Sequence, residues 1–65
     1  MRPIDYAIEL MAANSTDSDL FYDLVKSLYF EETSFIVAVS NCLKEHDPET
    51  LNRVDGIFYR MDCQL

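Results

Sequence analysis

LFYDLVKSLYFEETSFIVAVSNCL, residues 20–43, is the stretch that organises this chain. Fifteen of these 24 residues are apolar, and the polar run Glu31-Glu32-Thr33-Ser34 separates them into two groups. A chain of 65 residues has little interior in which to bury so much apolar surface. We therefore expect a second chain to cover part of this stretch.

The first half of the stretch predicts a helix over residues 17–30. It follows the run Asn14-Ser15-Thr16-Asp17-Ser18, whose side chains tend to bond to nearby backbone and so favour turns and helix starts. Thr16, followed three residues later by Asp19, resembles a capping box. The apolar residues of this helix fall on two adjacent ridges, one of Leu20, Leu24 and Leu28 and the other of Phe21, Val25 and Tyr29.

The second half predicts a helix over residues 34–45, with Thr33 as its N-cap. The β-branched residues within Phe35-Ile36-Val37-Ala38-Val39 favour a strand. However, the chain offers no second strand with which it could pair, and the same residues also fit helical spacing. Because this helix is apolar on nearly every side, we expect it to be the most buried element.

A further helix is predicted over residues 3–13, ahead of the central stretch. Pro3 suits the first turn of a helix, and apolar residues at helical spacing follow it. Asn14 tolerates the left-handed conformation of a C-cap, so we expect the helix to end there. If this helix packs only loosely, the bundle has three helices instead of four.

The last helix is predicted over residues 48–61. Asp47 suits the N-cap, and Pro48 suits the first helical position. Gly56 costs a helix about 1 kcal/mol relative to alanine, so we expect either a close approach by a neighbouring helix or a bend there. Together these signals predict an all-α fold, four short helices in a compact bundle that forms a single domain, residues 1–65.

The apolar residues divide into a predicted core and a surplus. Four short helices enclose one narrow interior, and the following residues would fill it: Ile8, Met11, Leu20, Leu24, Leu28, Ile36, Val39, Leu43, Leu51, Val54 and Phe58. The surplus would form an exposed patch of Tyr6, Phe21, Tyr22, Val25, Tyr29, Phe30 and Val37. Monomers rarely expose large apolar patches, and interfaces are rich in tyrosine and phenylalanine. We therefore predict a two-fold homodimer whose interface, in or near residues 17–45, uses Phe21, Tyr22, Val25, Tyr29, Phe30 and Val37.

The charge of the chain restricts its partners. Twelve acidic and five basic residues give a net charge of −7, which disfavours direct binding to nucleic acid and to anionic lipid. The carboxylates keep a small protein soluble, and they also offer an acidic surface to a basic partner. The acidic surface is predicted to consist of Asp17, Asp19, Asp23, Glu31 and Glu32.

The sequence contains no recognisable catalytic or metal-binding constellation, so we expect no enzymatic activity and no cofactor. Cys42 and Cys63 match no zinc spacing and are predicted to be reduced thiols. His46 lies near a predicted helix end, where its charge suits the local dipole. No secretory signal is visible, and the longest apolar run is too short to cross a bilayer. We therefore expect a cytoplasmic protein.

Three functions remain open at this point. The first is an accessory regulatory protein that acts through protein–protein contact. The second is a DNA-binding regulator of the helix-turn-helix type, although the predicted helix over 34–45 carries only Lys44 for phosphate contacts. The third is an acidic DNA mimic that blocks a DNA-binding protein.

In size, acidity and helical pattern, including residues 5–9 and 20–39, the chain resembles the small early proteins of temperate bacteriophages. The exo–xis region of lambdoid phages encodes several proteins of this kind. The resemblance implies an accessory factor in the lysis–lysogeny decision or in host takeover. It also implies that the partner is a host or phage regulatory protein in the host cytoplasm.

Overall fold

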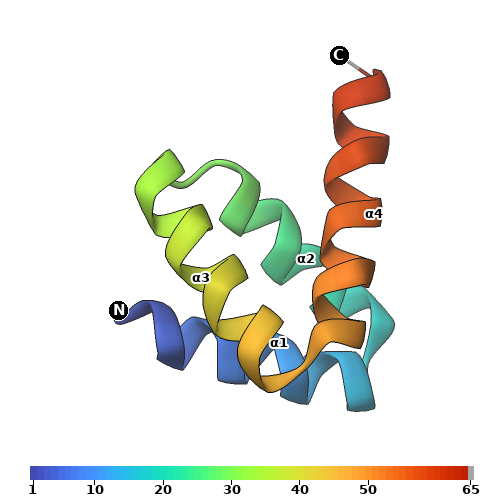
Figure 1. Ribbon diagram of the computed structural model, residues 1–65. Helices are drawn as coiled ribbons and strands as arrows, with labels where there is room; N and C mark the ends of the chain where they lie inside the picture. Colours follow the sequence, from blue (N-terminus) through green and yellow to red (C-terminus); the bar gives the residue numbers. More distant parts are fainter. Residues whose placement is uncertain (65) are drawn as a thin grey trace.

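The computed structural model describes residues 1–64, all of whose regular structure is helical. The four helices are α1 (Pro3–Thr16), α2 (Ser18–Tyr29), α3 (Thr33–His46) and α4 (Pro48–Gln64). Figure 1 shows α1 crossing the base, α2 and α3 above it, and α4 rising along one side with its C-terminal half projecting beyond the others. The all-α prediction and the four-helix count are confirmed.

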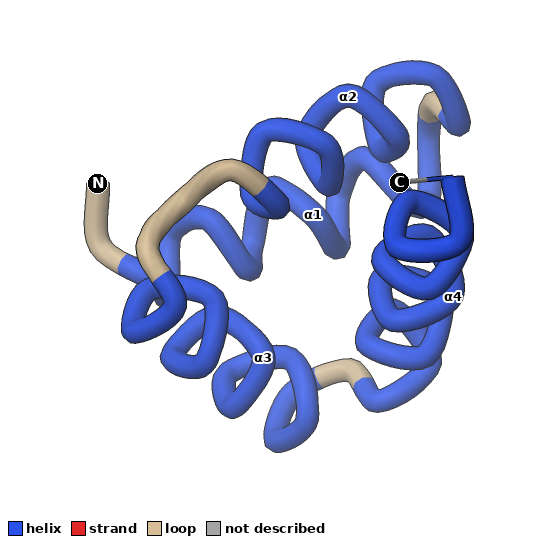
Figure 2. Tube along the Cα trace, turned by 90° about the horizontal axis from the view of Figure 1, so that it is seen from above, coloured by secondary structure: helices blue, strands red, loops and turns tan. Residues whose placement is uncertain are grey.

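The first helix, α1, is the base on which the fold is built. It packs against the other three helices, and viewed from above these are arranged around a common centre (Figure 2). The buried residues of α1 are Tyr6, Ala7, Leu10 and Ala13. By contrast, α3 fully buries only Val39 and Leu43. The prediction that residues 34–45 form the most buried helix is therefore wrong, because α1, which packs against the other three helices, turns more of its side chains into the shared interior.

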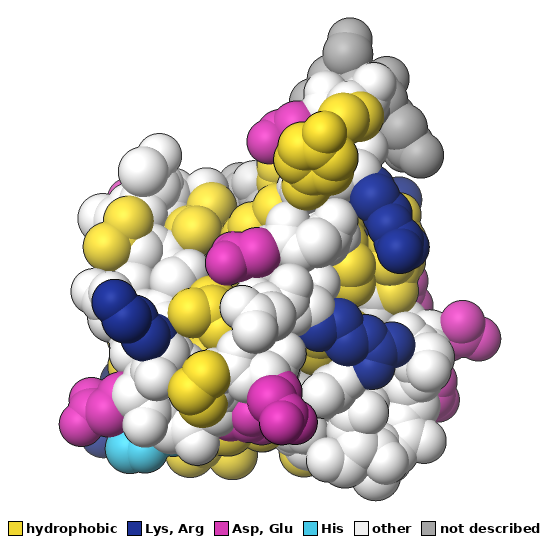
Figure 3. Space-filling model, turned by 45° about the vertical axis from the view of Figure 1, so that its right-hand side comes forward, with side chains coloured by type: hydrophobic (Ala, Val, Ile, Leu, Met, Phe, Trp, Pro, Cys, Tyr) yellow, Lys and Arg dark blue, Asp and Glu magenta, His cyan; other side chains and the backbone are white. Residues whose placement is uncertain are grey.

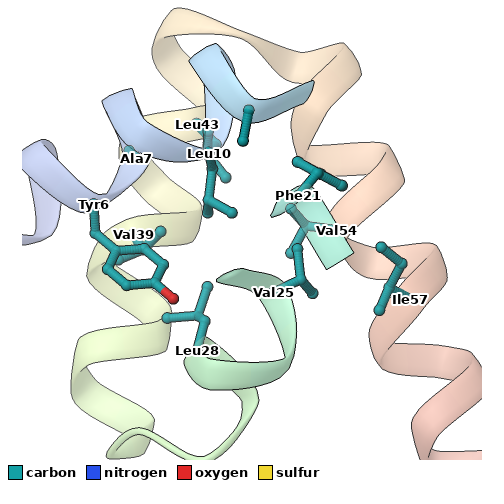
Figure 4. Close-up of a cluster of buried hydrophobic side chains, with 11 residues drawn as sticks. Tyr6, Ala7, Leu10, Phe21, Val25, Leu28, Val39, Leu43, Val54 and Ile57 are labelled. Carbon is teal, nitrogen blue, oxygen red and sulfur yellow. The ribbon is translucent and has the colours of Figure 1, made fainter. Parts of the chain in front are cut away.

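The core gathers side chains from all four helices, and their convergence is seen in Figure 4. From α2 it receives Phe21, Val25 and Leu28, each with no exposed surface. Leu20, predicted to be in the core, is 48% exposed. The predicted core face of this helix is therefore wrong for Phe21 and Val25, which point inward between α1 and α4, whereas the prediction that Leu28 is in the core is confirmed.

The burial predictions for two residues of α1 are also wrong. Tyr6 is buried, and its ring packs edge-on against Phe35 with centroids 5.7 Å apart. The Tyr6 hydroxyl donates a hydrogen bond to the carbonyl of Leu24, and burial raises the pKa of this phenol above its ordinary value. Ile8, a predicted core residue, is half exposed instead. A buried tyrosine is stable here because its hydroxyl reaches a backbone acceptor.

Helix α1 ends later than predicted. Asn14 does not cap it, and no described non-glycine residue has a positive φ. The helix continues to Thr16, whose hydroxyl donates to the carbonyl of Ala12 at 3.0 Å. Asp17, and not Thr16, then caps α2, because its carboxylate accepts the N–H groups of the second and third residues that follow at 2.9 and 3.1 Å.

The start of α4 follows the prediction. Asp47 is the cap, and Pro48 is the first helical residue. The carboxylate of Asp47 accepts the hydroxyl of Thr50 at 2.6 Å, and this bond is the main reason that its pKa is lowered. At the start of α3 the prediction is wrong: Thr33 is the first helical residue, and Glu32 occupies the N-cap without a side-chain bond.

Candidate functional site

A cleft lies between α2 and the middle of α4, and we call it the α2–α4 cleft. Its volume is about 460 Å³. Of the five basic residues in the chain, two arginines on α4 line this cleft. On this side of the molecule, basic side chains lie next to hydrophobic surface (Figure 3). The cleft is lined by Ser18, Asp19 and Tyr22 from α2 and by Arg53, Gly56, Ile57 and Arg60 from α4.

The lower end of the cleft is fixed by Arg53. Its guanidinium lies 4.6 Å from the centroid of the buried Phe21 ring, within cation–π range. It also donates a hydrogen bond to the side chain of Asn14 on α1. The amide of Asn14 in turn donates to the hydroxyl of Thr50 at 3.2 Å. Arg53 is therefore held in place by three helices, and this wall of the cleft is preorganised.

Above the cleft, α2 meets α4 again through aromatic rings. The ring of Tyr29 lies 5.7 Å from that of Phe58, and Phe30 packs edge-on against Tyr29 at 5.4 Å. The Tyr29 hydroxyl donates to Asp62 at 2.8 Å, and this bond is the main cause of its raised pKa. We call Tyr29, Phe30 and Phe58 the aromatic patch. Phe30 is 75% exposed, so one face of this patch is open.

The predicted interface residues do not form one surface. Phe21 and Val25 belong to the core, so the prediction that they are exposed is wrong. Tyr22 lines the α2–α4 cleft, where it is 43% exposed. Tyr29, half buried, and Phe30 belong to the aromatic patch. Val37 is exposed, but it lies on α3, which does not line the cleft.

The five predicted acidic residues are all exposed, but they are divided between the two ends of α2. Asp17 serves as a helix cap. Asp19 lines the α2–α4 cleft, and Asp23 lies one turn further along the helix. Glu31 and Glu32 follow Phe30 at the opposite end, so they lie next to the aromatic patch. The predicted acidic surface is therefore two separate groups of carboxylates.

Sequence reasoning did not find the α4 wall of the cleft. Arg53, Gly56 and Arg60 are spaced i, i+3 and i+7, which places them on one helix face, and this spacing was the available signal. Gly56 is exposed, and a Cβ placed on it would meet nothing within 4 Å. No neighbouring helix in the described part of the chain therefore approaches Gly56 closely, contrary to one of the two predicted explanations.

A second, shallower depression lies between α1 and α2, with a volume of about 390 Å³. It includes Leu20, which is exposed, and Leu24, which is half buried. Its other lining residues are Glu9, Ala12, Ala13 and Thr16. It offers apolar contact with few groups that could fix the orientation of a ligand, so the α2–α4 cleft is the better candidate site.

Within the described part of the chain, no three histidine, cysteine or acidic side chains gather closely enough to hold a metal ion. Cys42 is half buried and Cys63 is exposed, both as free thiols. No helix in residues 1–64 combines the length and apolarity that crossing a bilayer requires. On α3, the candidate recognition helix, the exposed residues include Lys44 and His46 but also Glu45.

Comparison with known proteins adds no assignment to this geometry. No protein-family model, curated protein or solved structure matches the chain significantly.

Proposed function

We propose that this chain is a non-enzymatic accessory protein that acts by binding another protein through the aromatic patch. The observation that carries the proposal is the exposure of Phe30, three quarters of whose surface faces solvent. Burying a phenylalanine side chain in a partner is worth about 2–3 kcal/mol. Exposed aromatic anchors of this kind are typical of the central residues of protein interfaces.

The patch is built to present Phe30 in a fixed position. Phe30 packs edge-on against Tyr29, and Tyr29 packs against Phe58 on α4. The hydrogen bond from Tyr29 to Asp62 holds the supporting ring in place. A rigid anchor loses less conformational entropy on binding than a mobile one. This arrangement supports a binding role more strongly than an isolated exposed side chain would.

The carboxylates beside the patch indicate the chemistry of the partner. Glu31 and Glu32 follow Phe30 directly and are exposed, in a chain whose net charge is −7. A partner with an apolar pocket rimmed by lysine or arginine would complement both features. The resemblance to early phage proteins suggests a host or phage regulatory protein in the bacterial cytoplasm, and this remains part of the proposal.

The proposal is tested by immobilising the chain, capturing proteins from a bacterial lysate and titrating the purified partner against variants. Phe30→Ala is expected to weaken binding at least tenfold, and the double variant Glu31→Lys/Glu32→Lys is expected to weaken it further at low salt. Ile8→Ala is the matched control, since Ile8 is a comparably open apolar residue on α1, 52% exposed. Unchanged affinity for the Phe30→Ala variant would contradict the proposal.

A further inference from the structure

We infer that the α2–α4 cleft is the contact surface between two copies of this chain, related by a two-fold axis that runs along the cleft. The inference rests on the proposed function in that both assign the chain to protein–protein contact. It uses different residues, however, since the aromatic patch lies outside the cleft lining. Compared with the interface predicted from the sequence, which lies in or near residues 17–45, this contact keeps α2 but uses α4 in place of α3.

The first argument is the distribution of charge across the cleft. The α2 wall carries the carboxylate of Asp19, and the α4 wall carries the guanidinium groups of Arg53 and Arg60. Within the part of the chain that the structure describes, the one salt bridge joins Arg2 and Asp5. The opposite charges on the two walls are therefore not paired with each other inside one copy.

A two-fold axis along the cleft resolves this lack of pairing. It places the α2 wall of each copy opposite the α4 wall of the other, as an isologous interface requires. Asp19 of one copy then faces the α4 wall of its partner, which carries Arg53 and Arg60, and the reciprocal contact forms by symmetry. An acidic ligand would meet Asp19, and a basic ligand would meet the arginines. A second copy, by contrast, supplies both signs in matching positions.

The second argument is Gly56. A glycine in a helix interior is unfavourable, and here no other helix within residues 1–64 comes within 4 Å of a Cβ placed on it. A glycine permits close approach of another backbone. Gly56 lies on the same helix face as the two arginines, so α2 of the second copy can pack closely against α4 there. The apolar contact is supplied by Tyr22, which also lines the cleft and is 43% exposed.

The charge arrangement is tested by sedimentation equilibrium of the full chain over a wide concentration range. The wild type is expected to form a dimer, and Asp19→Arg or Arg60→Asp alone is expected to weaken it at least tenfold. The double variant Asp19→Arg/Arg60→Asp exchanges the two charges and is expected to restore dimerisation. Asp23→Arg and Lys44→Asp are the matched controls, since they make the same charge changes at exposed positions outside the cleft.

Gly56 gives a test that is independent of charge. At a concentration where the wild type is monomeric, Gly56→Leu is expected to raise the urea midpoint of unfolding, since leucine favours helix and its Cβ meets no neighbour, while at high concentration it abolishes the dimer. A wild type that stays monomeric, a dimer unaffected by the charge variants or Gly56→Leu, or a double variant without rescue would each overturn the inference. Phe30→Ala is expected to leave the dimer intact, so failure of this inference and failure of the proposed function are separable.

Discussion

Helix α2 meets α4 twice, and the two contacts differ in kind. At the lower contact, Phe21 is fully buried, and Arg53 lies over its ring and bonds to α1. At the upper contact, Tyr29 packs on Phe58 and bonds to Asp62, but the adjoining Phe30 is open to solvent. The lower contact therefore secures the fold, whereas the upper contact leaves an aromatic side chain open to solvent.

The largest expected difference between the two contacts comes from removing one phenyl ring at each. Phe21→Ala leaves a cavity in the core and should cost about 3–5 kcal/mol of the free energy of unfolding. Phe30→Ala removes an exposed ring and should cost under about 0.5 kcal/mol. Urea denaturation followed by circular dichroism measures both. Equal losses would break the distinction between the contacts.

The next effect concerns the polar network beneath the lower contact. Thr50 is fully buried, and its hydroxyl donates to Asp47 and accepts from Asn14. Thr50→Val keeps the shape but leaves these partners without their bonds, so it should cost about 1–3 kcal/mol. Thr50→Ser keeps the hydroxyl and serves as the control. If the valine variant is as stable as the serine variant, the network does not secure the start of α4.

The sequence predicts those parts of the fold whose signals lie within a few neighbouring residues. The four helices follow from caps and spacing within a few residues, as Asp47 and Pro48 illustrate. The predicted end of α1 differs from the observed one by three residues, and the predicted start of α2 differs by one. The reason is that Asn14, Thr16 and Asp17 can all cap a helix. Local chemistry does not rank such alternatives, and the contact of Asn14 with α4 was not visible in the sequence.

The orientation of α2 could not be predicted from its own residues. Its leucine ridge and its aromatic ridge are both apolar, so either satisfies helical periodicity. Packing against α1 and α4 determines which face of α2 is buried, and it encloses Phe21 while Leu20 stays exposed. The cleft was missed for the same reason, because Tyr22 and Gly56 are brought together by the fold from distant parts of the chain.

A smaller effect is expected midway along α4, between the two contacts. Gly56→Ala should stabilise a single copy by about 0.4–1 kcal/mol, because alanine favours helix and its methyl group meets no neighbour. Thermal or urea unfolding at low protein concentration measures this change. A loss of stability would mean that another part of the same chain approaches Gly56 closely.

The smallest effect is expected at the upper contact. The hydrogen bond to Asp62 raises the pKa of Tyr29, so its stabilising contribution is present below the ordinary tyrosine pKa and is lost as the pH rises through the raised value. Asp62→Asn should return the pKa of Tyr29 toward its ordinary value. The change is followed by the ring resonances of Tyr29 in an NMR titration. An unaltered pKa would show that this bond does not hold Tyr29 in place.

We propose that two copies of this chain meet through α2 and α4, and a dilution series of ¹⁵N–¹H correlation spectra locates that contact residue by residue. A dimer of this kind predicts that, as the protein is concentrated, amide shifts grow at Asp19, Tyr22 and Gly56 and their immediate neighbours. Shifts centred instead on Ala12 and Leu20, in the depression between α1 and α2, or spectra that do not change with concentration, would contradict it.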